Sequence, residues 1–217
     1  MFIPRHPVVE NQFCSYKEDS SYGTAGVGGV ICYAGSVVYL DSSAANQEPM
    51  VEKMIFTHAT TPTIEPFGFA MQKVKVGYHQ VHPTGFMMPG DLGSSDVIAQ
   101  PLYNASGAIT GHKAAPLGVA HLGIWDTVHY TAAGTDMDTA APVPSAGLLP
   151  GEKLYAALDE AKVTNSSTLA ANDADDSAGD AVSQVVVAKV LKGASVAKIT
   201  ANVANTTLYP IRIKLLV

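Results

Sequence analysis

The histidines come closest to a metal-binding pattern in this chain of 217 residues. His79 and His82 stand three residues apart, and His121 and His129 flank the single tryptophan, Trp125. A zinc site needs a further pair of ligands at an interpretable spacing, and no cysteine or glutamate lies close to these histidines in the sequence. We therefore expect solvated or core-satisfied histidines, no metal and no cofactor, although the sequence leaves metal binding at the four positions open.

Two other motifs fall short of the sites that they resemble. An acidic run beginning at Asp173 has the composition of a calcium loop, but its sixth position is Ala178 instead of glycine and its twelfth is Gln184 instead of glutamate. The glycine cluster at 26–29 has Ile31 where a dinucleotide-binding fingerprint needs glycine or alanine. No Gly-x-Ser-x-Gly motif occurs, and neither cysteine has a protease signature around it. We expect no catalytic residues and no enzyme.

The charge content is low. Charged residues make up 15% of the chain, against roughly 25% in an ordinary soluble domain, while 47% of the residues are hydrophobic. A chain of this composition is expected to expose apolar surface, and we expect copies of the chain or a larger assembly to cover that surface. The net charge is -6, and the 13 lysines and arginines are scattered singly along the sequence. The sequence therefore shows no basic stripe for phosphates, and nucleic acid is not an expected partner.

No segment predicts secretion or membrane insertion. Prolines and a glutamate interrupt residues 1–10, where a signal peptide needs an apolar run. The charge-free interval 20–40 contains five glycines, which favour a loop followed by a strand over a membrane helix. We expect Cys14 and Cys32 to be free thiols in a protein made in a reducing cytosol, although their pairing stays open.

Short β-type runs separated by turn residues dominate the chain. They predict an all-β fold, a β-barrel or β-sandwich of short antiparallel strands with long loops. In the last run Ile211, Ile213 and Leu215 alternate with Arg212 and Lys214, which places the aliphatic side chains in the core and the charges outside. The expected strands are 37–40, 50–56, 67–71, 74–78, 97–103, 117–125, 128–130, 185–191 and 208–217.

Residues 152–162 allow two structures. Leu154, Leu158 and Ala161 follow helical spacing among good helix formers. The preceding Pro-Gly pair and the β-type run that follows instead match a hairpin with Asp159 and Glu160 at its tip. We favour the hairpin because it agrees with a phrase that recurs in the chain. That phrase, a β-type run reaching a tyrosine followed by a second run, occurs at 35–41 with 66–71, at 102–110 with 116–121, and at 154–164 with 185–191.

Residues 1–29 are rich in turn-forming residues and predict an extended N-terminal arm beside a β-rich domain at 30–217, with a sub-boundary near 131–147. The segments 131–147 and 164–181 predict long loops. The arm is expected to lie across a neighbouring subunit. Its apolar anchors would be Phe2, Ile3, Val8, Val9 and Phe13.

A set of short sequence segments between residues 35 and 216 resembles the decoration, or cement, proteins of tailed-bacteriophage heads. It comprises GSVVYLD at 35–41, PFGFA at 66–70, LPGEKLY at 149–155, DEAKVT at 159–164, VAKVL at 187–191 and IRIKLL at 211–216. The resemblance implies a barrel or tulip-like domain, made in the host cytoplasm, that binds the lattice of the major capsid protein, often as a homotrimer. It implies no catalytic residues.

Two other classes of protein remain as alternatives. A phage tail-tube or other virion protein would also be rich in β-structure and low in charge, although a tube subunit needs a long hairpin pair that the short predicted strands do not show. A carbohydrate-binding or hydrolytic β-sandwich would need exposed aromatic side chains, and the chain has a single tryptophan and few phenylalanines.

Overall fold

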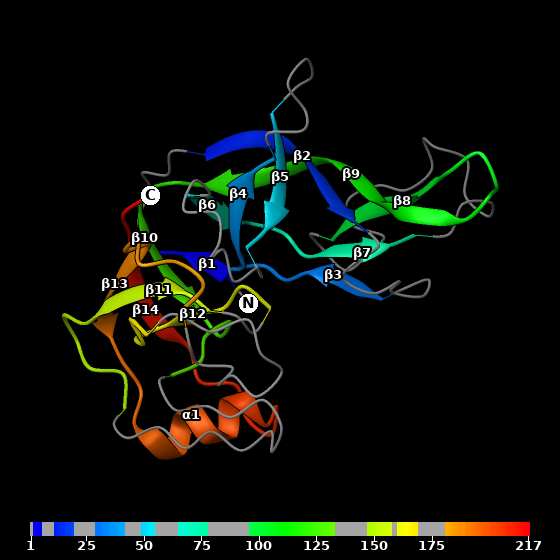
Figure 1. The fold of residues 1–217 in the computed structure, drawn as a ribbon. Helices are drawn as coiled ribbons and strands as arrows, with labels where there is room; N and C mark the ends of the chain where they lie inside the picture. The colour runs from blue at the N-terminus through cyan, green and yellow to red at the C-terminus, as the bar shows by residue number, and fades with distance from the viewer. Residues whose placement is uncertain are drawn as a thin grey trace.

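The described residues of the chain form two β-sheets, of eight and six strands, and one short helix (Figure 1). The predicted all-β fold is therefore confirmed. In the described part no helix is long and apolar enough to cross a membrane. The computed structural model describes residues 2–5, 11–19, 29–41, 49–54, 65–77, 96–132, 147–157, 160–168 and 181–217.

The eight-stranded sheet contains a closed ring. Its strand order is β2, β5, β4, β6, β9, β8, β7 and β3, and β2 pairs with β9 as well as with β5. Strands β2, β5, β4, β6 and β9 thus close into a small barrel, and β8, β7 and β3 extend from it. The bounds are β2 Asn11–Asp19, β3 Val30–Cys32, β4 Val37–Leu40, β5 Met50–Lys53, β6 Pro66–Ala70, β7 Val74–Val76, β8 Val97–Tyr103 and β9 Ile109–Ala120.

The six-stranded sheet packs against this barrel. Its order is β1, β10, β14, β13, β11 and β12, with every pair antiparallel. Because β10 pairs with β14, the sheet combines strands from both sides of 131–147, and that segment does not separate two sheets. The bounds are β1 Phe2–Pro4, β10 Ile124–Thr127, β11 Lys153–Ala156, β12 Val163–Thr164, β13 Ala188–Lys192 and β14 Ile211–Leu215, with α1 at Val196–Val203.

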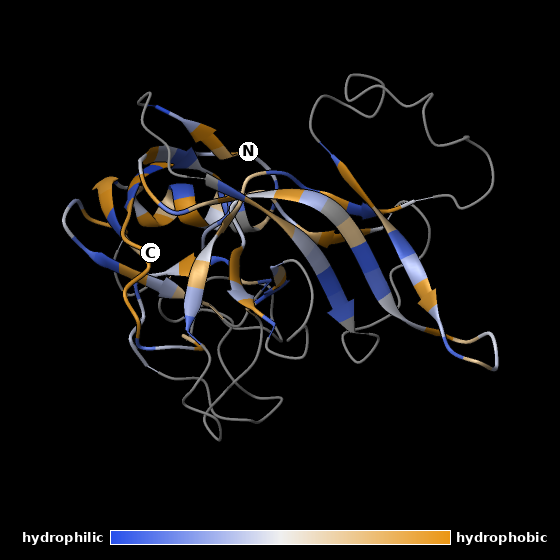
Figure 2. Ribbon diagram, turned by 90° about the horizontal axis from the view of Figure 1, so that it is seen from above, coloured by the Kyte–Doolittle hydropathy of each residue, from blue (hydrophilic) through white to orange (hydrophobic). Residues whose placement is uncertain are grey.

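Strand β4 lies between two hydrophobic cores. Val37 and Tyr39 belong to the core shared with the six-stranded sheet, whereas Val38 belongs to a core built only by the eight-stranded sheet. Successive side chains of a strand point to opposite faces, so a strand buried on both faces needs apolar residues at consecutive positions. Figure 2 shows hydrophobic stretches along several strands of the fold. This burial explains why the apolar run at 37–40 marked the strand so clearly.

The alternation predicted for the last strand is confirmed. Ile211, Ile213 and Leu215 are fully buried. Lys214 is exposed and Arg212 is half-buried on the opposite face. The predicted run 117–125, in contrast, is divided: β9 ends before Gly123, whose φ of +118° turns the chain, and β10 begins after it.

The prediction of a separate N-terminal arm is wrong for the described residues. Strand β1 pairs with β10, and β2 pairs along its length with β9. Pro4 is compatible with a strand here because β1 lies at the edge of its sheet. The signal of β2 was hidden by a bulge between Cys14 and Tyr16, which buries Cys14, Ser15 and Tyr16 in succession and breaks the period of two.

The hairpin predicted within 152–162 is confirmed, because β11 and β12 pair antiparallel. Its turn contains Glu160 and Ala161 in the left-handed region, with φ values of 52° and 53°. The helix α1, in contrast, was not predicted. It has only eight residues and contains β-branched Val196, Ile199 and Thr200, which are poor helix formers.

The recurring phrase does not correspond to one structural unit. Its first instance forms the separate strands β4 and β6, and its second lies at the turn between β8 and β9 and continues into β9 itself. The third forms the β11–β12 hairpin followed by β13. Of the two predicted long loops, residues 133–146 and 169–180 lie outside the described part of the chain.

Candidate functional site

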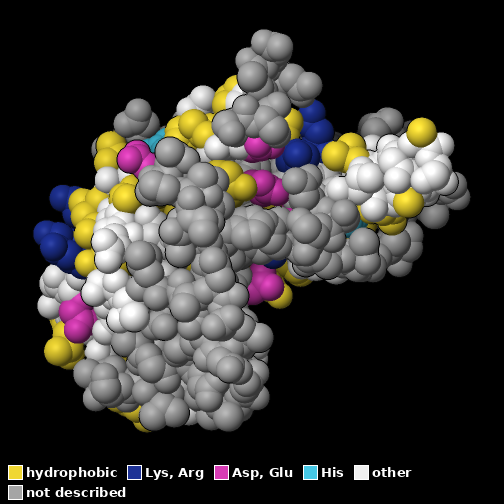
Figure 3. All heavy atoms as spheres, viewed as in Figure 1, with side chains coloured by type: hydrophobic (Ala, Val, Ile, Leu, Met, Phe, Trp, Pro, Cys, Tyr) yellow, Lys and Arg dark blue, Asp and Glu magenta, His cyan; other side chains and the backbone are white. Residues whose placement is uncertain are grey.

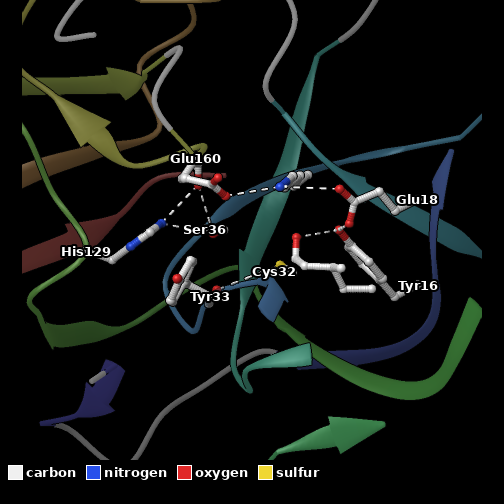
Figure 4. A network of polar contacts seen from close by, with 9 residues as sticks. Tyr16, Glu18, Cys32, Tyr33, Ser36, His129 and Glu160 are labelled. Carbon is white, nitrogen blue, oxygen red and sulfur yellow. Dashed lines mark hydrogen bonds and ion pairs between the residues drawn. The ribbon is translucent and has the colours of Figure 1, made fainter. Parts of the chain in front are cut away.

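A buried polar cluster joins the two sheets (Figure 4). Lys53 on β5 is buried, with its Nζ 3.3 Å from Oε1 of Glu18 on β2 and 3.0 Å from Oε2 of Glu160 in the β11–β12 turn. Tyr16 donates a hydrogen bond of 3.1 Å from its hydroxyl to Oε2 of Glu18. The cluster therefore connects the barrel with the turn of the other sheet through one cation and two carboxylates.

The protonation of this cluster follows from burial and charge pairing. Burial raises the pKa of Glu18, and the neighbouring Lys53 ammonium only partly opposes the shift. Burial by itself would lower the pKa of Lys53, but the carboxylates of Glu18 and Glu160 outweigh that effect and raise it above its usual value. Lys53 therefore stays charged at neutral pH and acts as a cation that holds the two carboxylates together, not as a nucleophile.

A serine and a histidine meet beside this cluster. Ser36 Oγ lies 3.0 Å from Nε2 of His129 and donates a hydrogen bond of 3.1 Å to the carbonyl oxygen of Glu160. His129 Nε2 lies 2.9 Å from the same carbonyl oxygen. Burial lowers the pKa of His129 to about 3, so the ring is neutral at physiological pH.

This pair lacks the geometry of a catalytic serine. A nucleophilic serine gives its proton to the histidine and faces substrate, whereas Ser36 is fully buried and its hydroxyl is directed at a backbone carbonyl. Both side chains instead hold Glu160, which has a strained positive φ. The Val37 N–H donates to the carbonyl of Ala161 at 2.9 Å and completes the attachment of the turn to β4.

The two cysteines are placed where their thiols are shielded from solvent. Cys14 and Cys32 are both buried, and neither forms a disulfide. Burial raises the pKa of Cys32 to about 12, which leaves its thiol protonated and unreactive at neutral pH. Cys32 lies beside the polar cluster, where its Sγ is 3.7 Å from the carbonyl oxygen of Tyr33.

The sequence-predicted histidines are not brought together. His121 has its Nδ1 2.7 Å from the carbonyl oxygen of Phe67, and His129 is held at the β11–β12 turn. His79 and His82 lie outside the described residues. Among the residues that the structure describes, no three histidine, cysteine or acidic side chains are grouped so that they could bind a metal ion.

The predicted arm anchors have different environments. Phe2 is buried within its own chain, where its ring stacks on Trp125 at 4.3 Å and on Phe69 at 5.8 Å between centroids. Ile3 is 37% exposed and Phe13 is 65% exposed, so both can contact a partner. Val8 and Val9 lie outside the described residues.

The β8–β9 hairpin is a second candidate site, and sequence reasoning did not single it out. It extends away from the barrel at the right of Figure 1. Residues 103–110 around its turn are all exposed and carry no charge. Tyr103 and Ile109 are register partners there, with exposed fractions of 56% and 38%. The side chain of Asn104 accepts hydrogen bonds from the backbone N–H groups of Ser106 and Ala108, so the turn is ordered.

The sequence of this chain was compared with protein-family models and with curated proteins. No protein-family model matches it, and none of the curated proteins matches its sequence.

Proposed function

We propose that this chain is a structural protein of a virus particle, a decoration protein that binds the assembled head lattice of a bacteriophage and stabilises it. The observation that carries the proposal is the β8–β9 hairpin, which holds an uncharged turn and the apolar pair Tyr103 and Ile109 in solvent. Exposed apolar side chains next to each other on an ordered element are typical of a contact with another protein. We infer that this hairpin contacts the lattice or a second copy of the chain.

The architecture of the hairpin supports a mechanical role. Strand β2 pairs with β9 as far as Gly111, so three strands support the base of the projecting turn. A subunit that binds only the assembled shell stabilises it by mass action. Many weak contacts of this kind, repeated over a lattice, add to a large total effect.

The buried polar cluster is consistent with the same role. Its serine and histidine hold a turn instead of facing a substrate, and its lysine is neutralised by two carboxylates. These interactions fix the two sheets relative to each other. If the two sheets keep a fixed relative position, a force applied at one contact surface of the protein reaches another contact surface, and this role needs no chemical reaction.

A tail-tube subunit is the second candidate, and the same hairpin favours it. A tube ring closes through long hairpins. Strand β8 has the seven residues predicted at 97–103, and β9 has twelve residues and begins at Ile109, well before the strand that the sequence predicted from 117 onward. Localisation distinguishes the two candidates, because electron microscopy of labelled particles would place a decoration protein on the head and a tube subunit in the tail.

The proposal is tested with the tip variant Tyr103→Ser/Ile109→Ser and the control Leu149→Ser/Leu208→Ser, which changes two apolar residues of comparable exposure elsewhere. Light scattering measures self-association, and co-sedimentation measures binding to particles assembled without the chain. We expect the tip variant to lose binding while the control retains it. A wild-type chain that is strictly monomeric and binds no particle would overturn the proposal.

A further inference from the structure

The fold aligns three lysines that are far apart in the sequence. Lys153 on β11 is the register partner of Lys189 on β13, and Lys189 is the register partner of Lys214 on β14. All three are exposed, while their sequence neighbours such as Leu154 and Ile213 are buried. Adjacent strands lie about 4.8 Å apart, so the three side chains leave the sheet within about 10 Å.

A second row lies beside the first on the same face. Lys192 is the register partner of Arg212, and Arg212 is the register partner of Asp126. Asp126 is bound by both Arg212, at 2.8 Å, and Arg5, at 2.6 Å. The two rows and Arg5 thus contain six basic side chains and one acidic one, which we call the basic face.

The basic face corrects the expectation that the cationic residues are scattered. Nearly half of the 13 lysines and arginines gather on this sheet, in a chain whose net charge is -6. Figure 3 shows dark blue atoms at the left edge of the molecule, where β11 and β13 lie in Figure 1. The sequence hid the cluster because only the strand register brings the residues together.

The lysine row is unfavourable for the isolated chain. Like charges directly opposite each other on neighbouring strands destabilise a sheet. In the described part of the chain, Lys153, Lys189 and Lys214 have no acidic partner, whereas Arg5 and Arg212 both bind Asp126. An acidic group from outside the chain would remove this repulsion.

We propose that the basic face binds a carboxylate-rich surface of another protein. Charge complementarity identifies the partner as acidic, and the short row matches a compact cluster of carboxylates. Apolar residues lie in the same rows: Ile3 is the register partner of Asp126, and Ile124 is the register partner of Lys214. A mixture of apolar and charged side chains is typical of protein interfaces.

Nucleic acid fits this face less well. Three of the four unpaired cations form a single short row, which offers no extended line of cations to a phosphate backbone. The net charge of -6 also repels a long polyanion that extends beyond the face. DNA binding is therefore the competing outcome of the test.

This inference deepens the proposed function, and only the identification of the partner as a shell protein rests on it. The basic face and the β8–β9 hairpin lie at opposite sides of the molecule in Figure 1. The chain would then have one apolar contact and one electrostatic contact. A subunit with two different contact surfaces can connect two neighbours in a lattice.

The test measures binding of a labelled oligoglutamate peptide by fluorescence anisotropy at low and high ionic strength, with a DNA duplex of matched charge in parallel. The variant Lys189→Gln/Lys214→Gln removes two members of the row. Lys113→Gln/Lys198→Gln is its control, because it changes the net charge equally at lysines on β9 and α1. Thermal unfolding of each variant shows whether the fold is retained.

We expect the wild-type chain to bind the peptide at low ionic strength and to lose affinity as salt screens the charges. The row variant should bind roughly tenfold more weakly, and the control should match the wild type. Equal weakening by both variants, no binding to the wild type, or a preference for DNA would overturn the proposal. Failure of particle binding with peptide binding retained would overturn only the proposed function.

Discussion

Lys53 and Lys189 are the same type of residue on strands of the two sheets, but their charges have opposite surroundings. Lys53 is buried and lies within 3.3 Å of one carboxylate and 3.0 Å of another. Lys189 is exposed and stands between two further lysines in the strand register. The first lysine stabilises contacts within the chain, whereas the second is placed against like charges.

This difference shows how the fold divides its few charged residues between two tasks. A buried cation is tolerated only when carboxylates and hydrogen bonds compensate for its lost hydration. An exposed cation costs little, so a protein can keep an unpaired row for a partner. The buried polar cluster and the neighbouring Ser36 and His129, which together we call the joint between the sheets, contain the compensated cation Lys53. The basic face contains the unpaired row.

Removing the buried cation should have the largest effect. Lys53→Met leaves Glu18 buried without its counter-charge, and breaking such a pair costs about 3–5 kcal/mol. Urea unfolding measures the loss. Lys113→Met is the control, since a half-exposed position without a described ion pair should change stability by no more than about 0.5 kcal/mol. Similar losses in the two variants would show that Lys53 is no more important than a surface lysine.

The next prediction concerns the N-terminal strand, which fixes the position of Arg5 on the basic face. Phe2→Ala removes the stacking of Phe2 on Trp125 and should destabilise the chain by about 3 kcal/mol. Phe13→Ala removes a ring that is 65% exposed and should have little effect. If thermal unfolding shows no difference between the two variants, the N-terminal segment behaves as the detached arm that the sequence suggested.

Strands with a regular apolar pattern could be predicted from the sequence, both the strand at 37–40 and the half-buried last strand, whereas β2 could not. The run at 37–40 was found with its observed bounds because both of its faces are apolar. Strand β2 was missed because its bulge interrupts the alternation and because it carries Glu18 into the polar cluster. Local pattern alone does not reveal a buried charge whose partners come from distant strands.

The candidate sites were harder to predict from the sequence than the strands, because their residues meet only in the tertiary structure. Ser36, His129 and Glu160 are separated by 93 and 31 residues along the chain, and no spacing motif links them. The lysine row likewise depends on the register of β11, β13 and β14. The terminal alternation predicted that Lys214 faces outward, but only the neighbouring strands show which charges it faces.

Acid should weaken the joint between the sheets through His129. Its folded pKa of about 3 lies below the unfolded value of 6.5, so the unfolded chain binds the proton more tightly and stability falls as the pH drops below 6.5. The loss between pH 7 and pH 5 from this residue is about 2 kcal/mol. His129→Gln keeps a side-chain donor for the Glu160 carbonyl but does not titrate. If urea unfolding of this variant depends on pH in the same way as that of the wild type, titration of His129 does not control the stability of the contact between the sheets.

The smallest effect should come from reversing one charge on the basic face, and its sign is the informative part. Lys189→Glu places a carboxylate between Lys153 and Lys214 in the register, so two repulsive neighbours become attractive. Each cross-strand pair of opposite charge contributes roughly 0.2–1 kcal/mol, and the variant should unfold at a higher urea concentration than the wild type. Lys198→Glu on α1 makes the same change in net charge away from the row and controls for it. A rise in stability together with loss of oligoglutamate binding would mean that the row is kept at a cost to the fold for the sake of a partner, whereas a fall in stability would mean that Lys189 supports the sheet itself.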